Sequence, residues 1–149
     1  MGRDDLMELY RSQIKEAPQL QLKLLHFFVN SGIRDDGYYW NELAKAVHCY
    51  CDLKAECPEL DSLDIGGGLP VPQSLNFSYN YEQIARQIIT NIQQICNERG
   101  VAPPHLFTEF GQYTVAESGA IILGIIGEKR QNDAETWYMI DNSIITSLP

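Results

Sequence analysis

The sequence predicts an α/β fold built around parallel strands, and three observations support this prediction. Segments with helical spacing of apolar residues alternate with short apolar segments along most of the chain. The short segments are almost wholly apolar, as expected of strands buried on both faces. They end in glycine or polar residues, where parallel strands turn back toward a helix. This alternation is typical of βα units that share one parallel sheet.

Three segments repeat apolar residues at helical spacing, namely Arg3–Glu16, Tyr38–Glu56 and Tyr81–Arg99. A proline follows each of the first two, and Gly100 follows the third at the position of a C-terminal cap. The isoleucines of the third segment do not persist over enough heptads for a coiled coil, so we interpret them as a core-facing stripe. Asp35-Asp36-Gly37 is typical of a turn that caps the second helix.

Five segments are expected to be strands, and little helix separates the last two. They are Leu22–Val29, Leu60–Ile65, His105–Thr108, Ala120–Ile126 and Thr136–Asp141. Val71–Tyr79 is expected to be a polar loop and Glu128–Glu135 a polar connection. The alternation of helix and strand stops before the last two strands, so we expect a change of architecture near Ser118.

Composition limits the class of protein. The 149 residues are 44% hydrophobic and 21% charged, which suits one globular domain with its own core. A net charge of -9 argues against a basic nucleic-acid interface. The longest apolar run, Ala120–Gly127, is too short to span a bilayer, and no apolar secretory segment follows Met1. We expect a cytoplasmic protein that binds neither nucleic acid nor membrane.

Functional residues are expected at the carboxyl ends of the strands, as in other parallel β/α folds. Three such ends carry unusual residues: Asn30-Ser31-Gly32, Gly66-Gly67-Gly68 and Glu109-Phe110-Gly111-Gln112. Consecutive glycines let backbone N–H groups approach an anion with no Cβ in the way, so a phosphate site is one interpretation of the triplet. A tight turn that needs positive φ is the other. The chain after the triplet does not follow the G-x-G-x-x-G pattern, which disfavours a dinucleotide.

The carboxylate of Glu109 directly follows an apolar strand, where its burial is costly unless it is paired. It could keep the ring nitrogen of a heterocyclic cofactor protonated. It could equally be a solvated or hydrogen-bonded residue at a strand end. Both interpretations remain open from the residues alone.

Cysteines beside His48 suggest a zinc site, but the spacing is not C-x-x-C. Cys49 and Cys51 also lie on different sides of the expected helix. We therefore expect reduced, packed thiols and no metal site. His26 is interpreted as a satisfied core histidine of a buried strand, and His105 as a surface residue that opens the third strand.

The motifs LHFFVNSG, LDIGGGLP and TEFGQ, in this order and spacing, resemble those of the fold-type III pyridoxal-phosphate decarboxylases. This family includes arginine, ornithine and diaminopimelate decarboxylases, and the resemblance is greatest to its arginine decarboxylase branch. It extends from about Asp4 to Pro149. It implies part of a parallel TIM-type (β/α) barrel, about the second half, that ends where a β domain begins. We expect one partial barrel domain over residues 1–149, with the strand leading into the β domain over about 136–149.

The resemblance implies a pyridoxal-phosphate site at the strand ends. In the family a glycine triplet, the backbone amides after a Glu-x-Gly-Arg motif and a nearby serine surround the cofactor phosphate. The glutamate of that motif pairs with the pyridine nitrogen, and a histidine stacks on the ring. The matching positions of this chain are, in the same order, Gly66, Gly67 and Gly68, then Gly111 and Gln112, Ser31, Glu109 and Phe28.

Three positions depart from the family pattern. Phe28 stands in place of the stacking histidine; it can still stack, but it cannot donate a hydrogen bond or carry charge. Asn30 stands in place of a glycine. Gln112 stands in place of the arginine, which removes one cation from the phosphate site. These differences indicate a divergent branch of the family.

The activity implied by the resemblance is that of a lyase. It converts arginine to agmatine in polyamine and spermidine biosynthesis, with pyridoxal phosphate as cofactor and Mg²⁺ in the full enzyme. No segment before Leu22 resembles the strand that carries the family's Schiff-base lysine, and a whole barrel takes about 250 residues. We therefore expect a fragment that is inactive alone and self-associates through its open edges. The alternatives are a non-catalytic homologue that regulates a partner and an unrelated phosphate-binding β/α domain.

Overall fold

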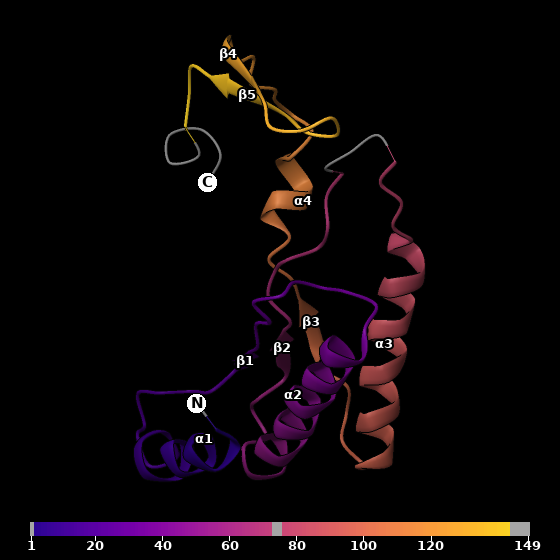
Figure 1. Cartoon of the computed structure of the whole chain (residues 1–149). Coiled ribbons are helices and arrows are strands. Elements are labelled where there is room, and N and C mark those ends of the chain that lie inside the picture. The colour runs from indigo at the N-terminus through magenta and orange to yellow at the C-terminus, as the bar shows by residue number, and fades with distance from the viewer. Residues whose placement is uncertain (1, 73–75, 144–149) are drawn as a thin grey trace. The chain divides into compact units, whose positions relative to one another are not determined.

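The computed structural model describes residues 2–72 and 76–143. The chain divides into two compact units, Met1–Thr114 and Val115–Pro149, and the boundary lies close to Ser118, as the sequence predicts. The first unit contains a parallel sheet with helices, and the second contains an antiparallel hairpin (Figure 1). None of the helices in the described ranges is long and apolar enough to cross a membrane.

The elements of the first unit alternate as the sequence predicts. In chain order they are α1 (Arg3–Leu9), the π-helical turn η1 (Tyr10–Ile14), β1 (Leu24–His26), α2 (Gly37–Glu56), β2 (Ser62–Asp64), α3 (Tyr81–Glu98), β3 (His105–Phe107) and α4 (Gly111–Val115). The sheet order is β1-β2-β3, and both pairings are parallel. α2 connects β1 to β2 and α3 connects β2 to β3, so the first unit consists of two consecutive βαβ crossovers.

The core forms where α2 and α3 pack together and against the sheet (Figure 1). β2 is buried along its whole length because it has a neighbour on each side. The isoleucine stripe of α3 is buried, as predicted. The end of α3 also agrees with the sequence, since Gly100 has a φ of +65° at the position after the helix cap. Asp36 caps α2 by accepting a hydrogen bond from the Tyr39 amide at 2.8 Å.

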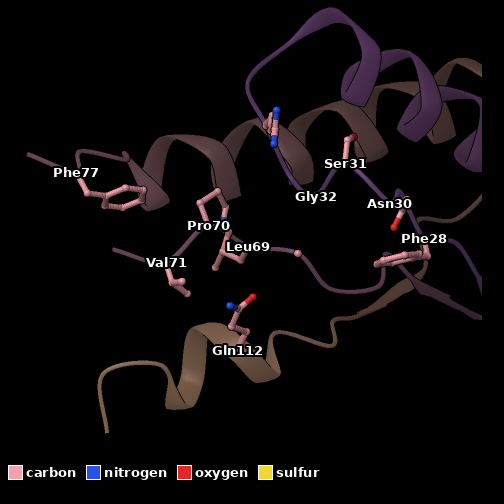
Figure 2. A pocket seen from close by; sticks show the side chains of 11 residues that line it. Phe28, Asn30, Ser31, Gly32, Leu69, Pro70, Val71, Phe77 and Gln112 are labelled. Carbon is pink, nitrogen blue, oxygen red and sulfur yellow. The ribbon is translucent and has the colours of Figure 1, made fainter. Parts of the chain in front are cut away.

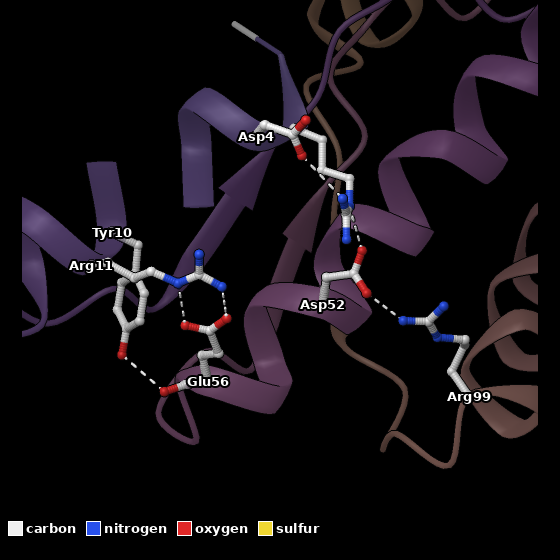
Figure 3. Close-up of polar contacts among 7 residues, drawn as sticks. Asp4, Tyr10, Arg11, Asp52, Glu56 and Arg99 are labelled. Carbon is white, nitrogen blue, oxygen red and sulfur yellow. Dashed lines mark hydrogen bonds and ion pairs between the residues drawn. The ribbon is translucent and has the colours of Figure 1, made fainter. Parts of the chain in front are cut away.

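Charged contacts attach α1 and η1 to α2 (Figure 3). Arg3 Nε of α1 donates to Asp52 Oδ2 of α2 at 2.6 Å. Arg99, at the end of α3, pairs with the other oxygen of the same carboxylate. Arg11 of η1 pairs with Glu56 of α2 through two guanidinium nitrogens. Burial of Asp52 acts to raise its pKa, but the hydrogen bonds and charges of Arg3 and Arg99 outweigh it and lower the pKa. The hydrogen bond from Arg11 likewise lowers the pKa of Glu56.

The second unit is a hairpin of β4 (Ile125–Arg130) and β5 (Thr136–Ile140). The two strands are antiparallel, with an irregularity in register between Ile125 and Gly127. Its large apolar side chains are mostly exposed, among them Ile122, Ile126 and Trp137. A two-stranded hairpin without a covered face is only marginally stable alone.

The burial predicted for the first strand is wrong. Leu22–Val29 contains only the short strand β1, and the side chains of Leu24 and His26 are exposed. β1 is an edge strand with one neighbour, so pairing and packing cover it less than β2. The prediction of a buried strand assumed neighbours on both sides. β3 is exposed for the same reason, and His105 opens it at the surface, as expected.

The limits predicted for the fourth strand are also wrong. Most of Ala120–Ile126 precedes β4, and the polar connection Glu128–Glu135 includes the last residues of β4. The register with β5 sets these limits, because Arg130 pairs with Thr136 while Ile125 pairs with Ile140. Charged residues are tolerated in β4 because the hairpin is exposed. β5 lies where the sequence predicts it, and residues 144–149 of the expected strand lie outside the described residues.

Two features were not predicted from the sequence. Residues Tyr10–Ile14 form a π-helical turn within the first helix, and α4 follows the third strand end. α4 is too short to show an apolar repeat, so the sequence gives no periodic signal for it. The single-domain assignment over 1–149 stays a prediction. The four cysteines are free thiols, as expected.

We expect the stability of the first unit to fall in acid because of Asp52. Its pKa is lowered in the folded state, so the contribution is present above the ordinary carboxyl pKa of about 3.9 and is lost as the pH falls below it. Asp52→Asn should lower the stability at pH 7 and flatten its pH dependence. Urea unfolding monitored by circular dichroism between pH 3 and pH 7 measures both. Asp133→Asn, at an exposed position, is the control, and equal pH profiles for the two variants would contradict the prediction.

Candidate functional site

The glycine triplet after β2 contacts the backbone of both neighbouring strand-end loops. A Cβ on Gly67 would lie 2.7 Å from the carbonyl oxygen of Glu109, in the loop after β3. A Cβ on Gly68 would lie 2.7 Å from the Cα of Gly32, in the loop after β1, and Gly68 also has a φ of +89°. Backbone atoms cannot move away as a flexible side chain could. The turn interpretation of the triplet is therefore confirmed: close packing requires glycine here.

Hydrogen bonds from the same loops reinforce this packing. The Glu109 amide donates to the Gly66 carbonyl oxygen at 2.9 Å, and the Ile33 amide donates to the Gly68 carbonyl oxygen at 2.9 Å. The Gly66 amide donates to Asp64 Oδ1 at 2.8 Å. The triplet thus uses two carbonyl groups and one amide to join three strand ends.

A cavity of about 320 Å³ lies beside the triplet (Figure 2). Its lining comes from the loop after β1, the chain that follows the triplet, and the first turn of α4. Figure 2 shows the amide of Gln112 directed from α4 toward Leu69 and Pro70. Phe28 presents an aromatic ring that is 54% exposed at one end of the lining. The cavity therefore combines an aromatic surface with polar groups.

Unpaired donors make this cavity suitable for an anion. Within residues 2–72 and 76–143, the backbone amides of Gly67 and Gly68 donate to no protein acceptor. Gly68 belongs to the lining, and Gly67 directly precedes it in the chain. Arg34 is the only charged side chain in the described part of the lining, which contains no carboxylate. Ser31, Asn30 and Gln112 add neutral polar groups. Free amides and a cation without a competing carboxylate are the groups that bind phosphate in proteins.

The residues predicted from the sequence divide between the cavity and its surroundings. Those that line the cavity are Phe28, Ser31, Gly68 and Gln112. Those outside its lining are Gly66, Gly67, Glu109 and Gly111. Sequence reasoning missed Arg34, which belongs to none of the quoted motifs and is brought to the cavity by the chain between Ser31 and α2.

Two tyrosine hydroxyls hold the walls of the cavity. Tyr79 donates to the Ile33 carbonyl oxygen at 3.1 Å, and Tyr81 donates to the Pro70 carbonyl oxygen at 2.9 Å. Their rings pack together with centroids 4.9 Å apart. Burial, with a smaller effect of the Asp35 charge, raises the pKa of Tyr79 to about 12, so this hydroxyl stays protonated and able to donate.

An acidic cluster lies at the same strand ends. His26 Nδ1 is 3.0 Å from Asp64 Oδ2, and one ligand atom each of His26, Asp64 and Glu109 lies within 4.8 Å of the others. The prediction of a buried His26 is wrong, since 49% of its side chain is exposed, although it has a partner as expected. An imidazole and two carboxylates at this spacing could hold a divalent cation, which the sequence did not indicate. The two carboxylates also suit a protonated ring nitrogen.

Most of the chain matches one protein family. Residues 4–116 match the family model described as pyridoxal-dependent decarboxylase, pyridoxal binding domain. The chain belongs to this family. The cofactor of these decarboxylases is pyridoxal phosphate, as the sequence motifs predict, and an unrelated phosphate-binding domain is excluded.

Among curated members of the family, similar proteins are named biosynthetic arginine decarboxylases. The protein of Geotalea uraniireducens is 32% identical over 118 residues, which cover 74% of this chain and 19% of that protein. The protein of Vibrio cholerae is 30% identical over 132 residues, which cover 83% of this chain and 21% of that protein. The chain thus spans about a fifth of the length of these relatives.

Solved decarboxylase structures share the fold. Diaminopimelate decarboxylase from Helicobacter pylori, complexed with L-lysine, has a TM-score of 0.72 at 22% identity, covering 96% of this chain and 34% of that chain. The biosynthetic arginine decarboxylase SpeA from Campylobacter jejuni has a TM-score of 0.62 at 24% identity, covering 76% of this chain and 20% of that chain. The parallel βαβ arrangement is therefore part of a decarboxylase TIM barrel, and the predicted fold class is confirmed.

The cavity fits the phosphate end of pyridoxal phosphate. The free amide of Gly68 could donate to a phosphate oxygen, and the side chains of Ser31 and Gln112 in the same lining could add hydrogen bonds. A Cβ on Gly68 would displace the loop that contains Gly32. Gly68 therefore provides both a free amide and the close packing of the two loops. The ring of Phe28 offers a stacking surface for a pyridine ring.

We expect Gly68→Ala to destabilise the first unit by roughly 2–3 kcal/mol, because it combines a backbone clash with a strained positive φ. Gly37→Ala is the matched control: nothing lies within 4 Å of its added Cβ, and it occupies the first turn of α2. Urea unfolding of both variants at pH 7 measures the difference. Equal stability of the two variants would show that the packing of Gly68 is not required.

Proposed function

We propose that this chain is the cofactor-binding part of a pyridoxal-phosphate-dependent arginine decarboxylase, a cytoplasmic enzyme that converts arginine to agmatine in polyamine biosynthesis. The observation that carries the proposal is the cavity beside the glycine triplet, with its unpaired amides and its aromatic wall. Family membership and identities of 30–32% to proteins named biosynthetic arginine decarboxylases support the substrate class. The Mg²⁺ expected for the full enzyme stays a prediction.

The phosphate group is assigned to the triplet side of the cavity. Gly67 and Gly68 would donate their free amides, Ser31 its hydroxyl and Gln112 its side-chain amide. Gly66 has a supporting role, because its amide and carbonyl are already used to hold Asp64 and the loop of Glu109. Gly111 is also supporting: its amide donates to the carbonyl of Glu109 at 2.8 Å, and it begins α4.

The pyridine ring is assigned to Phe28 and Glu109. Phe28 would stack on the ring face, and the Glu109 carboxylate would hold a proton on the ring nitrogen. Asp64 lies close enough to Glu109 to add to the negative charge there. When bound, pyridoxal phosphate supplies the electron sink that accepts the electron pair left by the loss of carbon dioxide. The residues of this chain position that group and keep its ring nitrogen protonated.

We further propose that the chain does not catalyse decarboxylation alone. Lysine is required for the covalent attachment of the cofactor in such enzymes. No lysine belongs to the described lining of the cavity. The expected activity of this chain is therefore cofactor binding through phosphate and ring contacts, without turnover.

Titration calorimetry tests this function with two compounds. Pyridoxal phosphate should bind at least about tenfold more tightly than pyridoxal, because only the former reaches the triplet amides. Glu109→Gln should lower the affinity for both compounds by the same factor, about tenfold, because both contain the ring nitrogen. Glu8→Gln, on an exposed face of α1, is the control. Equal affinities of the wild-type chain for both compounds would refute the phosphate assignment, and release of carbon dioxide from arginine would refute the inactivity.

Self-association is a further part of the proposal. β1 and β3 are edge strands within the described sheet, and Phe107 on β3 is 52% exposed. Unpaired edges with apolar side chains favour pairing with a second copy. Phe107→Lys should reduce the association seen by sedimentation velocity at rising concentration, whereas Ile89→Lys on α3 should not. A wild-type chain that remains monomeric at high concentration would contradict this part.

A second candidate function is a non-catalytic homologue that regulates a partner. Phe28 and Gln112 favour it, because both replace residues that the family motifs expect to be basic. The two candidate functions predict different results in the same calorimetric titration. A non-catalytic regulator would bind neither pyridoxal phosphate nor pyridoxal.

A further inference from the structure

The phosphate side of the cavity contains a cation that no family motif provides. Gln112 stands where the family motif has arginine, so the motif supplies no positive charge there. The structure brings Arg34 into the same lining as Gln112, Ser31 and Gly68. We infer that Arg34 replaces the missing arginine as the cation that binds the cofactor phosphate, an inference that rests on the proposed function.

The pairing of most other arginines supports this assignment. Of the five, Arg3, Arg11, Arg86 and Arg99 each form an ion pair with a carboxylate. Arg130 of β4 forms none with the described residues, but it lies outside the cavity lining. Arg34 forms no ion pair or side-chain hydrogen bond with the described residues, although the chain has 20 acidic residues against 11 basic ones. An unpaired guanidinium in an acidic protein, beside a cavity that lacks carboxylates, is available for an external anion.

The backbone on both sides of Arg34 is held in place. The preceding residue, Ile33, is buried, and its amide donates to the Gly68 carbonyl oxygen at 2.9 Å. The carbonyl oxygen of Ile33 accepts a hydrogen bond from the Tyr79 hydroxyl at 3.1 Å. Asp36 caps α2 shortly after. Arg34 therefore starts from a fixed point next to the free amide of Gly68, and only its side chain has to be ordered on binding.

The chemistry of the group fits a phosphate monoester. A guanidinium presents several N–H donors in one plane and can bind two phosphate oxygens at once. The amides of Gly67 and Gly68 can serve the remaining oxygens. In this arrangement the cation comes from the loop after β1, whereas the family motif places it after β3.

The test compares the full chain with Arg34→Met, Arg86→Met and the double variant Arg34→Met with Gln112→Arg. Arg86 is the matched control, because it is exposed on α3 and outside the cavity lining. Titration calorimetry measures the affinity of each chain for pyridoxal phosphate and for pyridoxal. Thermal unfolding followed by circular dichroism checks that each variant is folded.

Arg34→Met should lower the affinity for pyridoxal phosphate about tenfold and keep the affinity for pyridoxal within about twofold of the wild-type value. Arg86→Met should change neither affinity. The added Gln112→Arg should restore most of the affinity for pyridoxal phosphate, because it returns the cation to the family's position. The inference is overturned if Arg34→Met keeps wild-type affinity for pyridoxal phosphate, or if its affinities for pyridoxal phosphate and for pyridoxal fall by the same factor. A wild-type chain that does not prefer pyridoxal phosphate to pyridoxal overturns the proposed function and this inference with it.

Discussion

The close packing of the glycine triplet against the loops after β1 and β3 is the constraint on which the site depends. Gly67 contacts the Glu109 backbone and Gly68 contacts the Gly32 backbone, with no space for a side chain at either position. These contacts place Ser31, Gly68 and Gln112 around one cavity although they come from three separate strand ends. The amides of Gly67 and Gly68 have no protein acceptor among the described residues, so the segment that packs the loops together also offers the donors of the proposed phosphate site.

Helical periodicity made the fold largely predictable from sequence. α2 and α3 lie where their apolar repeats place them, and the order of alternating elements was correct. The burial predicted for the first strand was wrong. The apolar segment around β1 indicates a strand covered on both faces, but coverage depends on neighbours that a local pattern does not describe. The limits of β4 failed for a related reason, since a hairpin partner and not local polarity determines where that strand ends.

The candidate site was predictable only where motifs exist. Phe28, Ser31, Gly68 and Gln112 belong to motifs whose order indicates a shared site, and they do line one cavity. Arg34 could not be found in this way, because its approach to Gly68 depends on the hydrogen bond of the preceding amide to the triplet. The partnership of His26 with Asp64 was likewise invisible, since it depends on the register of β1 against β2.

The distribution of charge in this chain has a consequence for kinetics. The net charge of -9 repels a dianion at a distance, whereas the described cavity lining contains a guanidinium and no carboxylate. At physiological ionic strength the long-range repulsion is screened beyond about 8 Å, so it acts mainly during the final approach. An anionic ligand at the mouth of the cavity would therefore experience the nearby guanidinium more strongly than the distant acidic surface. The rate of capture would depend on this local charge and not on the net charge of the chain.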